Sequence, residues 1–131
     1  MNLDGKLDVV ASTSTTVQIF LNNSTSGSIS LTYTNSDLVS GGGTNVILAD
    51  FDNDGDNDIY TTNWKLYKND NPSAANNASS FTYIALTLYE YSMGISVADF
   101  NGNGRLNIIG GTTWDKSWIN ICKSLPLTSS S

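Results

Sequence analysis

The amino-acid sequence predicts an all-β protein built from a unit that repeats about every 50 residues. An Asp- and Asn-rich segment occurs three times, and its glycines Gly5, Gly55 and Gly104 are 50 and 49 residues apart. Short runs of Val, Ile, Leu and Tyr flank these segments and show no helical apolar period. Self-similarity at this spacing indicates a repeat architecture. Each unit is expected to contain a strand, an acidic loop and further strands.

The middle acidic segment carries the strongest chemical signal. Five aspartates alternate around Gly55 in this order: Asp50, Asp52, Asp54, Asp56 and Asp58. Carboxylates repel one another, whereas Ca²⁺ takes about six to eight oxygen ligands and tolerates flexible geometry. We therefore predict a calcium loop whose ligands are the other four side chains and the backbone carbonyl of Asp56. A metal-free turn is the alternative, because Asp, Asn and Gly favour turns by themselves, but three copies in register favour the metal.

The other two copies predict weaker sites. The third loop has one carboxylate among its expected ligand positions, which are Asp99, Asn101, Asn103, Arg105 and Asn107. Fewer charged ligands mean weaker calcium binding. The first loop has the ligand positions Asn2, Asp4, Lys6 and Asp8 and lacks a counterpart of Asp50. We expect it to bind poorly unless another chain supplies that ligand.

An EF-hand does not explain these loops. That motif needs a bidentate acid at position 12 and a helix on each side. Counted from Asp50 this position is Thr61, and counted from Asp99 it is Gly110. The flanking residues are rich in Val, Ile, Thr and Tyr, so we expect strands on both sides of each loop.

Two segments carry a resemblance to a known family. Residues 49–59 read Ala-Asp-Phe-Asp-Asn-Asp-Gly-Asp-Asn-Asp-Ile, and residues 98–108 read Ala-Asp-Phe-Asn-Gly-Asn-Gly-Arg-Leu-Asn-Ile. They resemble the FG-GAP/VCBS repeat of integrin alpha-subunit propellers and of many secreted microbial proteins. The resemblance extends over nearly the whole chain. It implies β-propeller blades of four antiparallel strands, with Ca²⁺ held between the first and second strand of each blade.

The apolar runs divide the chain into about two and a half to three such blades. A partial first blade spans residues 1–43, with strands expected at 7–11, 17–21 and 28–33, the last of them at an exposed edge. The second blade spans residues 44–92, with strands expected at 45–49, 59–62, 64–68 and 80–86. A partial third blade spans residues 93–124, with strands expected at 95–98, 107–110 and 117–122. Residues 125–131 form a Ser-rich tail.

This blade count is low, because propellers usually have about four to eight blades. We expect a fragment that forms a partial propeller, an open blade stack, or a ring that several chains complete. The chain is therefore predicted to be a homo-oligomer or part of a larger chain or assembly. Gly41, Gly42 and Gly43 mark the crossing from the first blade to the second. Phe51 and Phe100, the residues after the first aspartate of each complete loop, are expected to be buried beneath their loops.

Composition limits the possible partners. The net charge is −6, and only 14% of the residues are charged, against about 25% in typical soluble domains. Most of the acids lie in the three loops, and the basic residues do not cluster, which argues against nucleic acid and anionic membranes as partners. No apolar run is long enough for membrane insertion. A surface of Ser, Thr, Asn and Gly suits a secreted or cell-surface protein, and the lone Cys122 offers no disulfide framework.

The residues favour a binding role over catalysis. The chain has no histidine and no nucleophile paired with a base, so we predict that it is not an enzyme. We predict a structural or adhesion scaffold that contacts a protein or glycan at the cell surface. A lectin-like module is the alternative, with Trp114 as its candidate ligand-binding residue, because exposed aromatic rings stack on sugars. An accessory propeller fragment of a secreted carbohydrate-active enzyme is a further alternative. The sequence leaves the ligand open, and also whether Asn22, Asn23 and Asn77 are glycosylated.

Overall fold

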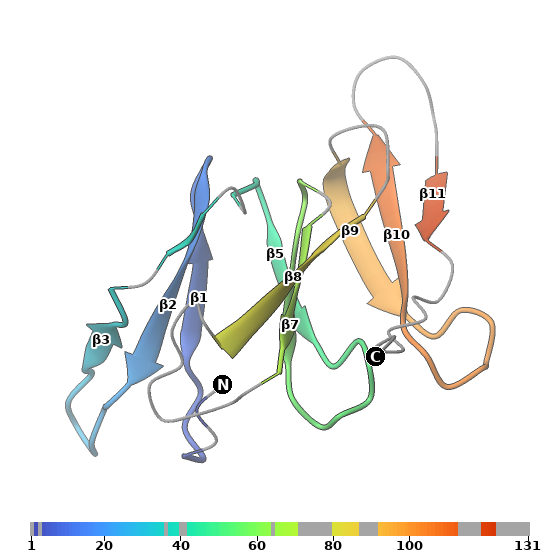
Figure 1. The fold of residues 1–131 in the computed structure, drawn as a ribbon. Helices are drawn as coiled ribbons and strands as arrows, with labels where there is room; N and C mark the ends of the chain where they lie inside the picture. Colours follow the sequence, from blue (N-terminus) through green and yellow to red (C-terminus); the bar gives the residue numbers. More distant parts are fainter. Residues whose placement is uncertain are drawn as a thin grey trace.

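The computed structural model describes residues 2, 4–35, 37–39, 42–63, 65–70, 80–86, 92–112 and 119–122. Within this part of the chain, three antiparallel sheets follow one another in sequence order (Figure 1). The first contains β1 (Val9–Ser12), β2 (Thr16–Asn22), β3 (Leu31–Tyr33) and β4 (Leu38–Val39). The second contains β5 (Val46–Ala49), β6 (Asp58–Thr61), β7 (Lys65–Asn69) and β8 (Phe81–Ala85). The third contains β9 (Ser92–Ala98), β10 (Asn107–Thr112) and β11 (Ile119–Cys122).

The second sheet is a complete four-stranded meander in the order β5-β6-β7-β8, the arrangement of a propeller blade. The other two sheets repeat parts of its register. Val9 pairs with Phe20, as Ile59 does with Tyr67 and Ile108 with Cys122. In the described residues, the first sheet has no counterpart of β5, and the third has no counterpart of β8. The all-β fold built from blades is therefore confirmed, while the blade boundaries given above stay predictions.

The outer strand of the first sheet is interrupted. β3 pairs with residues 20–22 of β2, and β4 pairs with residues 16 and 17 of the same strand. Both run antiparallel to β2, so together they form one broken edge strand, and Asn35 between them has a positive φ of 55°. The predicted edge strand over residues 28–33 is correct for its exposed second half. In its first half, Ser28 forms an isolated bridge with Thr25 instead.

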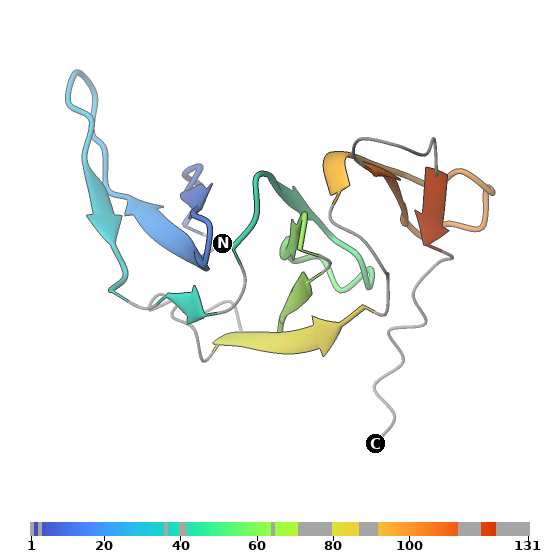
Figure 2. The same ribbon diagram turned by 90° about the horizontal axis from the view of Figure 1, so that it is seen from above.

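Two apolar clusters join the three sheets. One lies between the first and second sheets and contains Val17, Ile19, Leu38, Ile59 and Tyr67. The other lies between the second and third sheets and contains Phe51, Tyr60, Leu66 and Ile108. Neighbouring residues of β6 and of β7 enter opposite clusters, because successive side chains of a strand point to opposite faces. The second sheet is thus packed on both faces, and the sheets stand side by side in the view from above (Figure 2).

Phe100 corrects one expectation. Phe51 is buried at 3% exposure, as predicted, but Phe100 is 51% exposed. Phe51 packs with Tyr60 against Ile108 of the following sheet. In the described part of the chain, no further sheet follows the third one, so Phe100 has no such surface to contact. Burial of this aromatic position thus depends on the next sheet and not on the loop itself.

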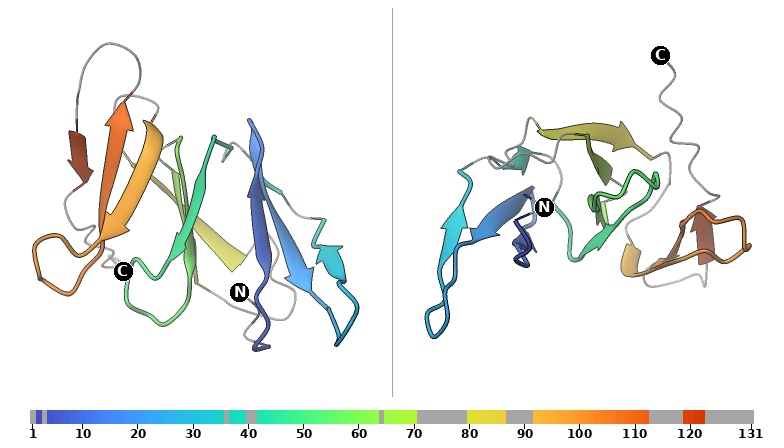
Figure 3. Two further views of the ribbon diagram at one scale, coloured as in Figure 1. Left: turned by 180° about the vertical axis from the view of Figure 1, so that it is seen from behind. Right: turned by 90° about the horizontal axis from the view of Figure 1, so that it is seen from below.

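The three acidic loops lie at the same end of the sheets (Figures 1 and 3). This follows from the repeated register, because each loop precedes an equivalent strand, namely β1, β6 and β10. The loops of the second and third sheets touch, since Asn53 Nδ2 donates a hydrogen bond to the carbonyl of Gly104 at 3.1 Å. Among the described residues, no helix is long and apolar enough to cross a membrane.

Candidate metal centre

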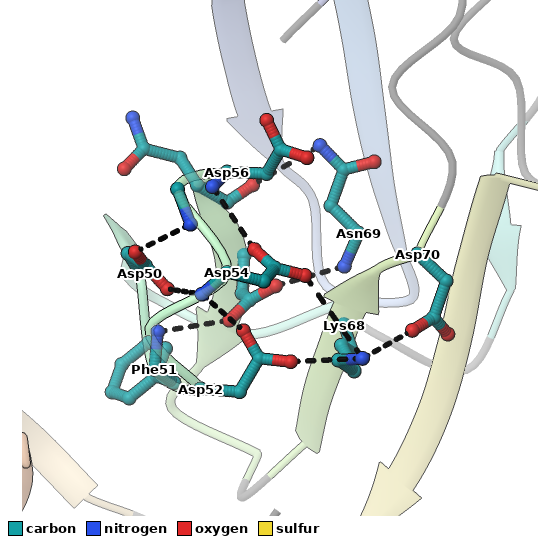
Figure 4. A network of polar contacts seen from close by, with 11 residues as sticks. Asp50, Phe51, Asp52, Asp54, Asp56, Lys68, Asn69 and Asp70 are labelled. Atoms are coloured by element: carbon teal, nitrogen blue, oxygen red, sulfur yellow. Dashed lines mark hydrogen bonds and ion pairs between the residues drawn. The ribbon is translucent and has the colours of Figure 1, made fainter. Parts of the chain in front are cut away.

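The loop between β5 and β6 is folded around the carboxylate of Asp50 (Figure 4). The Oδ1 atom of Asp50 accepts a hydrogen bond from the backbone N–H of Asp54 at 3.1 Å, and Oδ2 accepts one from Gly55 at 2.9 Å. Asp54 Oδ1 accepts the next one, from the N–H of Asp56, at 3.0 Å. The turn needs two left-handed residues, Asn53 with a φ of 63° and Gly55 with a φ of 95°. Gly, and to a lesser extent Asn, adopt this conformation at low cost.

Asp58, the first residue of β6, is completely buried and ties the loop to two strands. Its Oδ2 atom accepts the N–H of Phe51 at 2.9 Å, and its Oδ1 atom accepts the N–H of Asn69, at the end of β7, at 2.8 Å. Burial raises the pKa of Asp58 to about 6. A nearby cation favours the charged form of such a carboxylate.

Three side chains bring their oxygens together at this loop. Carboxylate oxygens of Asp50, Asp52 and Asp58 all lie within 4.8 Å of one another. Oxygens that share one Ca²⁺ bind it at about 2.3–2.6 Å and hence lie at most about 5 Å apart. The donor set consists of hard, anionic oxygens, so these residues fit a single calcium ion. Asp54 lies outside this group of three, and its Oδ1 atom accepts a hydrogen bond from the backbone N–H of Asp56.

A lysine that the sequence analysis did not single out lies beside these carboxylates. Lys68 Nζ is 2.8 Å from Asp52 Oδ2 and 4.0 Å from Asp54 Oδ2, and it also pairs with Asp70. Hydrogen bonds from the ammonium to Asp52 and Asp70 raise the pKa of Lys68. The loop carboxylates therefore have a cationic partner within the chain.

The third loop repeats this hydrogen-bonding pattern with fewer charges. Asp99 accepts the N–H groups of Asn103 at 3.1 Å and Gly104 at 2.7 Å, as Asp50 does in the second loop. Asn107 replaces Asp58 and accepts the N–H of Phe100 at 3.0 Å. The hydrogen bond from Gly104 is the main cause that lowers the pKa of Asp99. The loop conformation is thus kept with a single carboxylate among its ligand positions.

Asn101 and Asn103 of the third loop accept the same backbone hydrogen bonds as Asp52 and Asp54 do in the second loop. Asn101 Oδ1 accepts the N–H of Asn103 at 3.2 Å, as Asp52 does for Asp54 at 3.3 Å. The N–H of Arg105 donates to Asn103 Oδ1 at 2.9 Å. Amide oxygens therefore direct this turn as well as carboxylates do, so the loop shape alone does not specify a metal.

The first loop keeps the second half of the pattern. Asp4 accepts the N–H of Lys6 at 2.9 Å, and this bond is the main cause that lowers the pKa of Asp4. Asp8 Oδ1 accepts the N–H of Asn22 at 2.9 Å, as Asp58 does from Asn69. Asn2 Oδ1 accepts the N–H of Asp4 at 3.3 Å. Asp4 and Asp8 are not part of a group of three acids like that of the second loop, within the residues described.

Two asparagines were missed as part of these sites. Asn22 and Asn69 end β2 and β7, and each donates its backbone N–H to the last acid of its loop, which is the half-buried Asp8 or the fully buried Asp58. Their side chains add a second link, because Asn22 Nδ2 donates to the carbonyl of Leu7 at 2.8 Å and Asn69 Nδ2 to that of Asn57 at 3.4 Å. The sequence contains a signal for this role, since Asn follows the third apolar run in both repeats: Ile-Phe-Leu-Asn and Leu-Tyr-Lys-Asn.

The contacts of Asn22 and Asn23 show how accessible these two potential glycosylation sites are. The Asn22 side chain is half-buried and engaged at both ends, since its Oδ1 also accepts the N–H of Ser24 at 3.0 Å. Asn23 is exposed, and its Nδ2 donates to Thr32 Oγ1 at 2.8 Å. A glycan on Asn22 would disrupt the link to the first loop. Asn77 lies outside the described residues, as does Trp114, the candidate ligand-binding residue.

Comparison with known proteins supports the repeat assignment. Residues 1–61 match the family model of the FG-GAP-like repeat. The matched segment contains the first two acidic loops and continues to the end of β6. No curated protein and no solved structure matches the chain. The predicted repeat family is thus confirmed over that segment.

Proposed function

Because residues 1–61 carry an FG-GAP-like repeat, the unit of β-propeller blades, we propose that the chain is a calcium-stabilised, non-catalytic scaffold that acts outside the cell. The observation that carries this proposal is the convergence of Asp50, Asp52 and Asp58 between the first two strands of a complete blade. The same loop shape with fewer carboxylates at the third sheet argues that charge, rather than conformation, marks the second loop as the main metal site.

The proposed role of the metal is structural. The carboxylates of Asp50 and Asp58 are already hydrogen-bonded to backbone N–H groups of the loop and of β7, so an ion on them would join the loop to the sheet. A ligand that binds only the folded state stabilises it by RT ln(1 + [Ca²⁺]/Kd). FG-GAP repeats are generally non-catalytic, and the chain has no histidine to act as a general base.

Calcium is therefore expected to raise the melting temperature. At free calcium about 100-fold above Kd, mass action contributes about 2.7 kcal/mol, which corresponds to roughly 10 °C for a domain of this size. Thermal unfolding of the full chain in calcium and in excess chelator measures this shift. Asp50→Asn is expected to lose most of it, whereas Asp37→Asn, the same charge change outside the loops, should keep it. Equal melting temperatures of the wild type in calcium and chelator would refute the metal site.

The partner is proposed to be a protein or a glycan at the cell surface. An adhesion or assembly role is favoured by the repeat family, which occurs typically in extracellular proteins. The lectin-like alternative rests on Trp114 in a Gly-Thr-Thr-Trp-Asp-Lys segment. Binding to a glycan array that is lost in Trp114→Ala would favour the lectin. A silent array together with capture of a purified protein ligand would favour adhesion. The accessory role in a carbohydrate-active enzyme is supported only by the same family resemblance.

The faces of the outer sheets also favour assembly between copies. Each sheet has a forward face, which points toward the next sheet in the chain, and a backward face on the opposite side. In the two apolar clusters, the forward face of one sheet packs on the backward face of the next. Phe100 and Ile109 stand on the forward face of the third sheet, at the positions of Phe51 and Tyr60. Val9 stands on the backward face of the first sheet, at the position of Ile59, and is 41% exposed. We propose that these two faces pack head to tail between copies and continue the blade stack.

This assembly makes a prediction about mass in solution. Light scattering of the full chain in calcium is expected to give a multiple of 14.0 kDa. Phe100→Asp should shift the protein toward the monomer, because a buried charge without a partner is strongly unfavourable at an interface. Ile29→Asp is the control, since Ile29 is 89% exposed and lies outside the strands of the first sheet. A monomeric wild type, or a multimer that Phe100→Asp leaves intact, would contradict this packing.

A further inference from the structure

Lys68 lies beside the candidate metal centre, on the strand that neighbours β6. Its ammonium contacts Asp52, which is one of the three converging carboxylates, at 2.8 Å. This contact is largely removed from solvent, since the side chain of Asp52 is 6% exposed and that of Lys68 is 22% exposed. Ion pairs shielded in this way are screened far less than surface pairs. In Figure 4 the ammonium lies between Asp52 and Asp54 on one side and Asp70 on the other.

The position of Lys68 in the blade explains how it reaches the loop. β7 pairs with β6, and the next residue, Asn69, donates its N–H to the buried Asp58. Two consecutive residues of β7 therefore hold two different carboxylates of the same site. Asn69 fixes Asp58 through the backbone, and Lys68 fixes Asp52 through its charge.

The ion pair between Lys68 and Asp52 reduces the repulsion among the loop carboxylates. The loop concentrates negative charge that is unfavourable without a cation, because it holds the converging Asp50, Asp52 and Asp58 and also Asp54. The ammonium of Lys68 compensates part of it in the metal-free protein. A divalent ion bound to Asp52 would share that carboxylate with the ammonium and would experience its positive charge.

We propose that Lys68 is a positioning residue that holds Asp52 in the metal-free loop and lowers the affinity of the site for calcium. This inference rests on the calcium binding proposed above. It follows from linkage, because a contact that stabilises the metal-free state more than the metal-bound state reduces the affinity by the corresponding factor. Loss of Lys68 should therefore destabilise the metal-free protein more than the metal-bound protein and so tighten calcium binding.

Lys68→Gln in the full chain tests this inference. We expect its Kd for calcium, measured by titration calorimetry, to fall roughly fivefold or more. In excess chelator, we expect its midpoint of denaturant unfolding to be lower than that of the wild type. A merely structural role would weaken the protein in chelator without tightening calcium binding, so the opposite signs distinguish the two roles.

Lys65→Gln is the matched control. Lys65 lies on the same strand and loses the same charge, but its Nζ stands over the ring of Tyr83 at 5.8 Å from the centroid. Lys65→Gln should leave the calcium Kd unchanged. Lys68→Arg keeps the positive charge and should bind calcium with the wild-type Kd. The inference is overturned if Lys68→Gln binds calcium no more tightly than Lys65→Gln does. If the wild type does not bind calcium, the proposed function fails, and the unfolding midpoints in chelator still decide whether Lys68 stabilises the metal-free loop.

Discussion

Replacing Asp58 with alanine is expected to destabilise the metal-free protein by about 3–5 kcal/mol and to abolish most of its response to calcium. The carboxylate is completely buried and accepts two backbone N–H groups, those of Phe51 and Asn69. Alanine would leave both donors without this acceptor, and each buried unsatisfied group costs about 1–3 kcal/mol. It would also remove one of the three converging carboxylates.

Asparagine is the informative second substitution at this site. Asn107 occupies the equivalent position in the third loop, where its Oδ1 atom accepts the N–H of Phe100. Asp58→Asn therefore keeps one of the two acceptors, and we expect it to lose about 1–2 kcal/mol together with the calcium response. Denaturant unfolding in chelator and in calcium measures both quantities. An alanine variant within about 1 kcal/mol of the wild type, or one that keeps the calcium shift, would show that Asp58 does not join the loop to the sheet.

The parts of the fold that the sequence predicts are those encoded locally. The acidic loops were found because Asp50 and its neighbours recur in register around a glycine, and the φ of 95° at Gly55 shows why that position needs one. The strands beside the loops are short apolar runs, which are also visible locally. Phe51 was assigned correctly to the core, but its burial depends on the next sheet, which is present to cover it.

The parts that were missed depend on contacts between segments distant in sequence. Lys68 and Asn69 reach the loop because β7 pairs with β6, and no local pattern marks a lysine on a strand as a partner of Asp52. β4 has two residues, which is too short for a periodic signal, and it is defined only by its pairing with β2. The exposure of Phe100 depends on a neighbouring sheet, and the composition of its own loop does not indicate it.

At the crossing between the first two sheets, the sequence likewise does not reveal how closely Gly42 approaches Thr13 and Thr15. This close approach predicts a large loss of stability on substitution. Gly42→Ala is expected to cost about 3 kcal/mol or more, beyond the usual range for overpacking. A Cβ atom on Gly42 would lie 2.2 Å from the backbone nitrogen of Thr15 and 2.4 Å from the carbonyl oxygen of Thr13. The N–H of Gly43 donates to that same oxygen at 2.9 Å, so the two backbones are held together there.

A second glycine separates this steric effect from a general effect of alanine. Gly94, in β9, has no atom within 4 Å of its would-be Cβ and no positive φ. Gly94→Ala should therefore be neutral or stabilising by up to about 1 kcal/mol, because alanine restricts the unfolded chain. Denaturant unfolding of both variants, in chelator and in calcium, measures the contrast. Because the crossing lies away from the acidic loops, Gly42→Ala should lower both midpoints equally. Equal stabilities of the two variants would mean that the sheets are not joined by this close backbone contact.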